Sequence, residues 1–286
     1  LNLYGTTTSV TNAVTFGTSG TVAFGNGSDT LTFTGGLVHS AGPNSIAGTL
    51  ATTNTALTLN SATAVTTNSS IAAGSGTVTL GAATLSDGVT LTLGTGDSGA
   101  ITATSFTGTA SGSASNVTFN VTGAVTVSGA IGTDIGTLTV TNSGGATFSG
   151  AVGASGDRVA SIVLTATTGT VAFDGDLYAT GITNAGGSFN LNLYGTTTSV
   201  TNAVTFGTSG TVAFGNGGDT LTFTGGLVHS AGATSIGGSI ISSDQDISLA
   251  ATTLTANSDI DTTGTAAGNI LFSSTIATAG NALALD

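Results

Sequence analysis

The chain has 286 residues and a formal net charge of −12, and only 5% of its residues are charged, against about 25% in ordinary soluble domains. All 13 acidic residues are Asp, Arg158 is the one basic residue, and Cys is absent. A chain with one cation cannot neutralise a phosphate backbone, so we expect no nucleic-acid partner. The lack of Cys excludes disulfides and thiolate metal sites.

Helix-forming residues are scarce, whereas Thr, Val, Ile and Phe, which suit a pleated sheet, are abundant. No stretch approaches the ~18 consecutive apolar residues of a transmembrane helix, so we expect no membrane insertion in this segment. The pattern is already under way at Leu1 and still under way at Asp286. We therefore expect the segment to come from a longer chain.

Short alternating strands begin near the start of the chain. The segment 30–34 reads TLTFT, which places Leu31 and Phe33 on one face and the three Thr residues on the other. The preceding segment 25–29 reads GNGSD, a run of residues that favour tight turns. The pattern therefore predicts a short half-buried strand after a Gly-rich corner.

The same alternation recurs along the chain, again between Gly-, Asn-, Ser- and Asp-rich corners. Further apolar pairs are Leu57/Leu59, Val78/Leu80, Leu91/Leu93, Val117/Phe119, Val125/Val127, Leu138/Val140, Val171/Phe173 and Leu191/Leu193. Pro43 is the only Pro, as expected if most strands are central and need their N–H groups for pairing.

A long internal repeat organises the chain. Residues 1–42 recur at 191–232 with one difference, Ser28 against Gly218, and weaker similarity continues beyond both copies. We therefore predict one long repeat unit at 1–190 and the first half of the next unit at 191–286.

Short strands between frequent corners predict an all-β fold, a right-handed parallel β-helix (β-solenoid) with coils of roughly 20–27 residues. Inward Val, Leu, Ile and Phe would form its core, and outward Thr and Ser would cover its faces. Tandem β-sandwich modules are the alternative, because the offset of the long repeat would accommodate two modules of about 95 residues.

The chain resembles large bacterial β-strand-repeat surface proteins, a group that includes filamentous-haemagglutinin-like adhesins and autotransporter passenger domains. The matching stretches are GTLTVTNSGGATFSGAVG (136–153), LTATTGTVAFDGDLY (164–178) and LTANSDIDTTGTAAGNILFSSTI (254–276). The resemblance implies a right-handed parallel β-helix, export from a bacterium, and a role in attachment or in an extracellular matrix. It carries over no functional residue.

The residues required for catalysis are not assembled. The two His residues, His39 and His229, occupy the same position in two copies of the repeat. Catalytic groups seldom recur once per structural repeat, so we interpret both as solvated corner residues or as satisfied hydrogen-bonding groups. Ser and Thr without an orienting base do not indicate a nucleophile. We predict no enzyme, no catalytic residue and no organic cofactor.

Calcium is the one cofactor that the sequence suggests. The segments GNGSDTL (25–31) and GNGGDTL (215–221) resemble the Ca²⁺-binding nonapeptide of RTX proteins, with Asp29 and Asp219 as ligands. The nonapeptide does not recur in tandem here, and the competing interpretation of both segments is a tight turn.

Asp residues two positions apart form the second set of calcium candidates. They are Asp244 with Asp246 and Asp259 with Asp261, and Asp174 with Asp176 has the same spacing. On a strand, each pair would project from one face and repel unless solvent or a cation intervenes. A solvated edge that discourages sheet association is the alternative.

Thr-x-Thr pairs recur at 30/32, 77/79, 90/92, 137/139 and 220/222. Stacked on a flat face they would resemble the surfaces with which ice-binding proteins order water, but their irregular spacing argues against a regular lattice, and Thr is the default outward residue of a strand.

From the composition, the repeats and the resemblance together, we expect this chain to be a structural segment of an extracellular or cell-surface bacterial fibre that self-associates into filaments or sheets. The alternative is the stalk of a surface adhesin that binds glycans or other cells.

Overall fold

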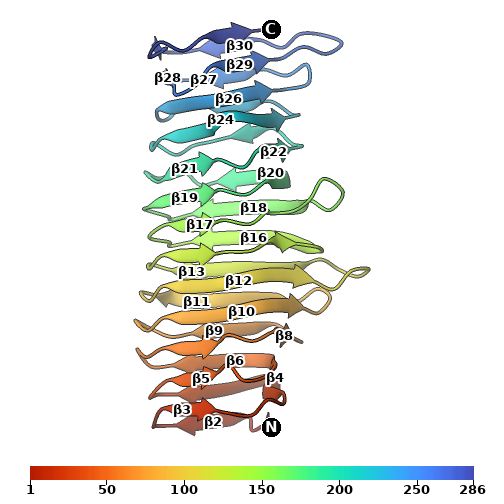
Figure 1. Ribbon diagram of the computed structural model, residues 1–286, viewed down its shortest axis with the longest axis vertical. Coiled ribbons are helices and arrows are strands. Elements are labelled where there is room, and N and C mark those ends of the chain that lie inside the picture. The colour runs from red at the N-terminus through yellow and green to blue at the C-terminus, as the bar shows by residue number, and fades with distance from the viewer. The chain divides into compact units, whose positions relative to one another are not determined.

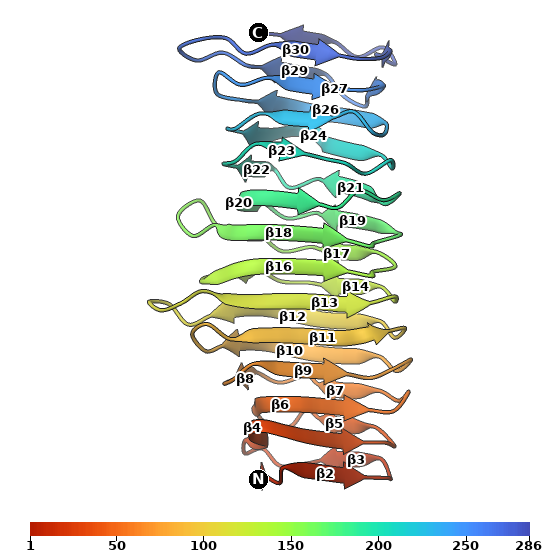
Figure 2. The ribbon, with the colours of Figure 1, turned by 180° about the vertical axis from the view of Figure 1, so that it is seen from behind.

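The computed structural model describes residues 1–286, which form two compact units, Leu1–Gly144 and Gly145–Asp286. All elements are β-strands, and the ladders between named strands are parallel (Figure 1, Figure 2). No helix could cross a lipid bilayer.

Each unit is a parallel β-solenoid, which confirms the predicted fold class. The tandem β-sandwich alternative is wrong, because a sandwich would pair consecutive strands in antiparallel hairpins. Here a strand instead pairs with the strand one coil further along, in the same direction. The handedness stays a prediction.

Unit 1 contains three sheets, each built from one stretch of every coil. Sheet 1A comprises β1 (Asn2–Leu3), the first parts of β4 (Val22–Phe33) and β6 (Asn44–Thr52), β8 (Thr63–Val65), the second parts of β10 (Val78–Leu85) and β12 (Ile101–Gly108), and β15 (Ile131–Gly132). Sheet 1B comprises β2 (Thr7–Val10), the second parts of β4 and β6, β9 (Ser69–Ala72), β11 (Thr90–Asp97), β13 (Ser115–Val121) and β16 (Ile135–Thr141). Sheet 1C comprises β3 (Val14–Phe16), β5 (Leu37–His39), β7 (Leu57–Leu59), the first parts of β10 and β12, and β14 (Val125–Val127).

Unit 2 is built in the same way. Sheet 2A comprises β17 (Ala146–Phe148), β19 (Thr170–Phe173), β21 (Asn190–Leu193), the first parts of β24 (Val212–Phe223) and β26 (Thr234–Ile241), β28 (Thr252–Leu254) and β31 (Ile276–Ala277). Sheet 2B comprises β18 (Val159–Thr165), β20 (Leu177–Asn184), β22 (Thr197–Val200), the second parts of β24 and β26, β29 (Ser258–Asp261) and β32 (Leu283–Leu285). Sheet 2C comprises β23 (Val204–Thr205), β25 (Leu227–His229), β27 (Ile247–Leu249) and β30 (Ile270–Phe272).

Coil length varies while strand register is kept. Thr30 pairs with Thr49, 19 residues on, whereas Thr92 pairs with Thr118, 26 residues on. The difference is taken up at the corners, where loops of different length leave the coils (Figure 2). The shortest offset is 18 residues, between Thr234 and Thr252, so the coils extend from slightly below the predicted range of roughly 20–27 residues to near its upper end.

The core follows from the period-2 alternation, since every second residue of a strand points inward. One inward row of sheet 1B is made of Leu31, Leu50, Ile71, Leu93, Phe119 and Val140. Each of these side chains is at most 1% exposed. Phe24 packs edge-on against Phe33, with ring centroids 6.2 Å apart, and the repeat partners Phe214 and Phe223 do the same at 5.8 Å.

Gly is required where successive corners approach closely. A Cβ at Gly99 would lie 1.8 Å from the carbonyl oxygen of Gly76, and one at Gly123 would lie 2.5 Å from the carbonyl oxygen of Gly99. Stacked corners of this kind explain why part of the high Gly content recurs with the period of the coils.

The two copies of the long repeat fall in different units, with 1–42 in unit 1 and 191–232 in unit 2. The compact units are defined by packing and the repeat by sequence, so their boundaries differ. The division of the repeat at 190/191 stays a prediction.

Candidate functional site

The most regular chemical feature of the molecule is an outward row of hydroxyl side chains on sheet 1B. We call it the hydroxyl row, and it consists of Thr7, Thr30, Thr49, Ser70, Thr92, Thr118 and Thr139. Each member is paired in register with the next, so seven consecutive strands contribute one hydroxyl each. At about 4.8 Å per strand, the row extends for roughly 29 Å.

The irregular sequence spacing of the Thr residues does not break this row. Spacing along the chain and spacing along the solenoid axis are separate quantities. The second Thr of the pairs forms no such row, since Thr32 is in register with Ala51 and Ala72, and the expectation against a regular lattice stays a prediction. The corner loops absorb the differences in coil length, and the backbone ladder then holds every strand at the same axial distance.

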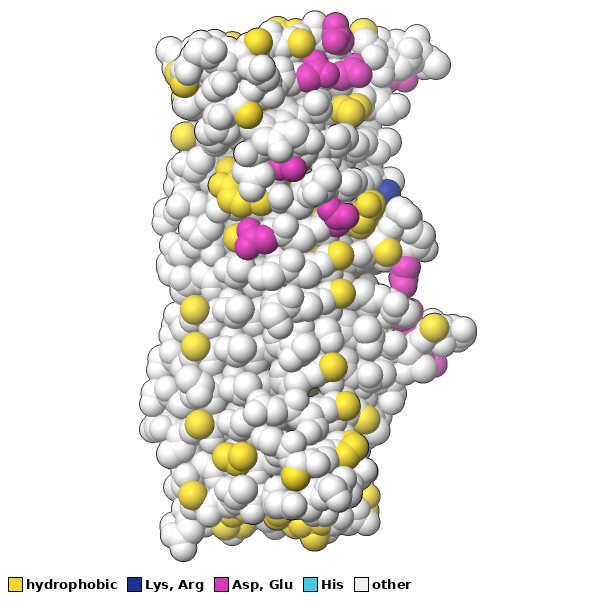
Figure 3. All heavy atoms as spheres, viewed as in Figure 1, with side chains coloured by type: hydrophobic (Ala, Val, Ile, Leu, Met, Phe, Trp, Pro, Cys, Tyr) yellow, Lys and Arg dark blue, Asp and Glu magenta, His cyan; other side chains and the backbone are white.

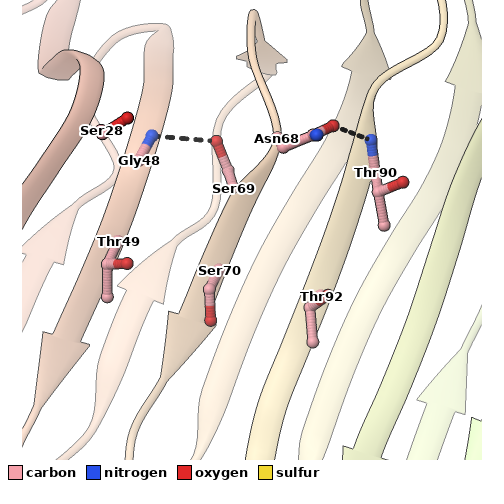
Figure 4. Close-up of a pocket in the computed structure, with 8 residues that line it drawn as sticks. All are labelled: Ser28, Gly48, Thr49, Asn68, Ser69, Ser70, Thr90 and Thr92. Atoms are coloured by element: carbon pink, nitrogen blue, oxygen red, sulfur yellow. Dashed lines mark hydrogen bonds between the residues drawn. The ribbon is translucent and has the colours of Figure 1, made fainter.

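A shallow hollow of about 450 Å³ lies over part of the hydroxyl row, and Figure 4 shows its lining. Thr49, Ser70 and Thr92 lie side by side on three neighbouring strands. At the corner beside them, Ser69 Oγ accepts a hydrogen bond from the Gly48 N–H at 3.1 Å, and Asn68 Oδ1 accepts one from the Thr90 N–H at 2.8 Å. These two hydrogen bonds hold the backbone of the corner in place. The hydroxyl groups of Thr49, Ser70 and Thr92 remain available to solvent or to a partner.

The lining of the hollow is neutral and lacks aromatic side chains. Its remaining member, Ser28, is exposed on the corner of β4. Hydroxyl and amide groups without a charge or an aromatic platform suit a polar, uncharged partner surface.

Unit 2 does not reproduce the hydroxyl row. Its equivalent strands begin with Thr197, Thr220 and Ser239, but the next positions in register are Asp259 and Ala284. The hydroxyl surface is thus a property of unit 1, although the two units contain near-identical copies of the repeat.

Charge is distributed in the same unequal way. Nine of the 13 Asp residues and Arg158 belong to unit 2, against four Asp residues in unit 1. In the view of Figure 3, acidic side chains gather on unit 2, whereas the visible face of unit 1 is mostly neutral polar and backbone atoms with single apolar side chains.

Asp29 and Asp219 each close a turn at the corner of their own strand. Asp29 Oδ2 accepts a hydrogen bond from the Asn26 N–H at 3.0 Å, and Asp219 Oδ2 accepts one from the Asn216 N–H at 2.8 Å. Both side chains are buried, at 8% and 7% exposure. A carboxylate that accepts from the N–H group three residues earlier is the arrangement expected of a tight turn. Calcium binding by Asp29 and Asp219 stays a prediction.

Asp244 and Asp246 lie in the corner between β26 and β27, not on a strand as the pair pattern suggested. Asp244 has a φ of 58° and accepts hydrogen bonds from the Ala266 N–H and the Thr265 hydroxyl at 2.8 and 2.9 Å, which lower the pKa of its carboxyl. Its repeat counterpart Asn54 has a φ of 57° and accepts a hydrogen bond from the Ser75 N–H. A neutral amide therefore fills the same role.

These two carboxylates line a second, smaller hollow. Asp244 and Asp246 share it with Val204, Gly226 and Gln245, and its volume is about 250 Å³. Asp246 is itself hydrogen-bonded, since its Oδ1 accepts from the Asn269 backbone and side-chain N–H groups at 2.8 and 3.0 Å.

Asp259 and Asp261 project outward from β29, as their spacing predicts. Burial, followed by the nearby carboxylates of Asp286 and Asp261, raises the pKa of Asp259. Hydrogen bonds from the Thr263 hydroxyl and N–H lower the pKa of Asp261. No group of three or more Asp or His side chains is arranged to hold a metal ion.

His39 and His229 are not at solvated corners, so that part of the prediction was wrong. Both lie on strands, in β5 and β25, and both are 0% exposed. Their imidazole rings are hydrogen-bonded at both nitrogens, as the alternative interpretation predicted.

Comparison of the chain with protein-family models, with curated proteins and with solved structures gives no match. The fold itself defines the class: the chain is a parallel β-solenoid repeat protein.

Proposed function

We propose that this chain is a structural, non-enzymatic segment of an extracellular or cell-surface bacterial fibre, and that it self-associates laterally through the hydroxyl row of unit 1. The single observation that carries the proposal is the uninterrupted, uncharged row of seven hydroxyls in strict register. Two such rows can exchange hydrogen bonds with each other at a common axial spacing.

The energetics favour a neutral contact of this kind. Bringing charged side chains into an interface requires their desolvation, whereas hydroxyl groups can replace water with hydrogen bonds to one another. Each exchanged bond is worth about 0.5–1.5 kcal/mol, so a row of several supports an association that depends on many weak contacts acting together.

Electron microscopy of the purified protein in millimolar calcium, with a matched chelator control, tests this function. We expect filaments or sheets with a regular axial repeat. If the assemblies are lost in chelator, assembly requires calcium, for which the Asp residues are the candidate ligands. If they persist, the hydroxyl contacts hold the assemblies together without calcium. Separate short rods in both conditions would contradict self-association.

A charged variant identifies the face that associates. Thr49→Asp, Ser70→Asp and Thr92→Asp together place three like charges along the row, and we expect assembly to fail. The matched control is Thr58→Asp, Thr79→Asp and Thr102→Asp, which adds the same charge to an outward row of sheet 1C. Equal loss of assembly in both variants would contradict the assignment to sheet 1B.

The hollow of about 450 Å³ favours a second candidate, the stalk of a surface adhesin that binds glycans. Neutral hydroxyl and amide groups match a neutral sugar, and the shallow, non-aromatic lining predicts weak binding. Titration with neutral oligosaccharides should shift the NMR signals of Ser28, Asn68 and Ser70. Shifts spread evenly over both units would argue against this candidate.

A further inference from the structure

The chain contains two Asn-Gly steps, Asn26-Gly27 and Asn216-Gly217, at the same position of the two repeat copies. The main-chain nitrogen that follows an Asn can attack its side-chain amide and close a five-membered ring. Gly favours this reaction because it has no Cβ to hinder the approach and because its backbone reaches conformations that other residues avoid. Whether the ring closes in the folded protein depends on how each corner holds its Asn and its Gly.

Both steps lie in a bulge that the strand ladder leaves unpaired. The register of β4 on β6 is interrupted between Phe24 and Asp29, and the equivalent interruption occurs in the pairing of β24 with β26. Neither Gly27 nor Gly217 therefore has a ladder partner, and a Cβ built on either residue would meet nothing within 4 Å. The nitrogen that would attack is thus held by no strand pairing and is surrounded by open space.

The side chains that would be attacked are open to water. Asn26 and Asn216 are both exposed. The backbone N–H of each is anchored by the carboxylate three residues on, at 3.0 Å from Asp29 Oδ2 and at 2.8 Å from Asp219 Oδ2. The turn therefore holds the Asn residue in place next to a Gly that has no ladder bond.

The two Asp-Gly steps of the chain provide a contrast. Gly88 N–H donates to the carbonyl oxygen of Ser113 at 2.6 Å, and Gly175 N–H donates to that of Phe148 at 3.4 Å. Each of these nitrogens is engaged with a neighbouring coil, so it is not available to attack the preceding Asp. The fold thus leaves the nitrogen outside the ladder at the Asn-Gly steps and engages it at the Asp-Gly steps.

We propose that Asn26 and Asn216 are sites of spontaneous deamidation in the folded protein, and that Asn216 converts faster than Asn26. In each corner a bond forms between the Gly nitrogen and Asn Cγ, the Cγ–Nδ2 bond breaks, and ammonia leaves with the proton that the Gly nitrogen loses. Water then opens the succinimide ring at one of its two carbonyl groups and yields Asp or isoaspartate. Water is the only co-reactant.

The one difference between the copies sets the order. In the first copy Gly27 is half-buried and is followed by Ser28. In the second copy Gly217 and Gly218 are both exposed, with φ of 139° and 78°. Two adjacent Gly residues sample more backbone conformations than Gly followed by Ser, so the corner of Asn216 reaches the ring-closing geometry more often.

Either product alters the turn in which it forms. Asp at position 26 adds a carboxylate close to the buried carboxylate of Asp29, and isoaspartate adds an atom to the main chain between the Asn26 N–H and the Asp29 oxygen that accepts it. That hydrogen bond should therefore weaken. The new charge also lies two residues from Ser28, which lines the hollow over the hydroxyl row.

Peptide mass spectrometry tests the proposal on the full chain, incubated folded in mildly alkaline buffer and then digested with pepsin in acid, which stops the reaction. The amide-to-acid mass change gives the extent of conversion at each Asn, and an isoaspartate assay confirms the route through the ring. We expect conversion first at Asn216, then at Asn26, and both ahead of Asn60, which is exposed but precedes Ser. A parallel sample in urea gives the rates of the unfolded chain.

Three variants separate the chemistry from the surroundings. Gly27→Ala adds a Cβ in open space at a residue without a positive φ, so the fold accommodates it, and conversion at Asn26 should be lost while that at Asn216 is unaltered. Ser28→Gly should accelerate conversion at Asn26, and Gly218→Ser should slow it at Asn216. Each of these two exchanges installs the residue of the other copy.

Retention of both amides in the folded chain, under conditions in which the sample in urea loses them, would overturn the proposal, because the bulge would then protect its Asn. Conversion at Asn26 that is no faster than at Asn60, or that Gly27→Ala leaves unaltered, would overturn it as well. Faster conversion at Asn26 than at Asn216 would contradict the order that the two corners imply.

Discussion

At the scale of single residues, the inward rows show where one side chain conflicts with its neighbours. Thr198 on β22 lies in register between Leu177 and Leu221, is 0% exposed, and its hydroxyl has no hydrogen-bond partner. An unpaired buried hydroxyl lowers stability because it loses water without compensation.

Thr198→Val should therefore stabilise the protein by about 1 kcal/mol, measured by urea unfolding. Thr8→Val is the matched control, since Thr8 is the repeat counterpart and is only half-buried. We expect little change there, and equal gains at the two positions would contradict the explanation.

Asp259 is a second residue in conflict with its surroundings, and its effect depends on pH. Since burial and the carboxylates of Asp286 and Asp261 raise its pKa, the folded state binds this proton more tightly than the unfolded state does. The residue therefore costs stability progressively as the pH rises above 3.8.

Asp259→Ser, which installs the residue found at Ser70, should raise the melting temperature at pH 7 and have little effect below pH 3.8. Thermal unfolding across this range measures the difference. Asp246→Ser is the control, because that carboxylate has hydrogen-bond donors from Asn269. A benefit of Asp259→Ser that does not change with pH would argue against the electrostatic origin.

At the scale of the elements, the stacked Gly corners restrict what each coil can contain. Gly99→Ala should destabilise unit 1 by about 1–3 kcal/mol, because the added Cβ would meet backbone that cannot move aside. Gly132→Ala, whose Cβ meets nothing within 4 Å, should change stability little. Equal unfolding midpoints for the two variants in urea would contradict the packing of the corners.

Arg158, directly before β18, is hydrogen-bonded to two further strands of sheet 2B, β20 and β22. Its Nη1 donates to the carbonyl oxygens of Ser199 and Ala179 at 2.8 and 3.3 Å, and its Nη2 donates to Ser199 Oγ at 2.9 Å. The guanidinium also lies over the Tyr178 ring, 5.9 Å from its centroid. Arg158 is the only Lys or Arg residue of the chain. Its hydrogen bonds hold neighbouring coils together.

Arg158→Ala should lower stability by about 1–3 kcal/mol and increase hydrogen exchange in β20 and β22. Arg158→Lys keeps the charge but loses the forked donor geometry, so we expect it to recover only part of the loss. Full recovery with Lys would show that charge alone, not the set of hydrogen bonds, accounts for the effect.

Strand positions and the solenoid fold could be predicted from the sequence because the period-2 alternation of pairs such as Leu31 and Phe33 is a local property. The hydroxyl row could not, because register between Thr92 and Thr118 depends on how a corner loop is accommodated. The same limit applies to His39 and His229: an isolated His beside Gly-rich residues suggests a corner, and only the inward direction of β5 and β25 shows that they are buried.

At the scale of the whole molecule, the two compact units share a fold and a repeated sequence but present different surfaces. Unit 1 has the hydroxyl row, and unit 2 has most of the Asp residues and the single Arg. Near-identical coils can therefore present different surfaces, and the proposed association uses the surface of unit 1 alone. Export and surface location are part of the proposed function, and both come from the resemblance to bacterial β-strand-repeat surface proteins.

Sedimentation velocity over a dilution series tests self-association most directly, with the unaltered chain, the Asp variant of sheet 1B and the Asp variant of sheet 1C measured in parallel. We predict that the sedimentation coefficient rises with concentration for the unaltered chain and for the sheet 1C variant, and that it stays at the monomer value for the sheet 1B variant. A monomer value at every concentration for the unaltered chain would contradict a self-associating structural segment.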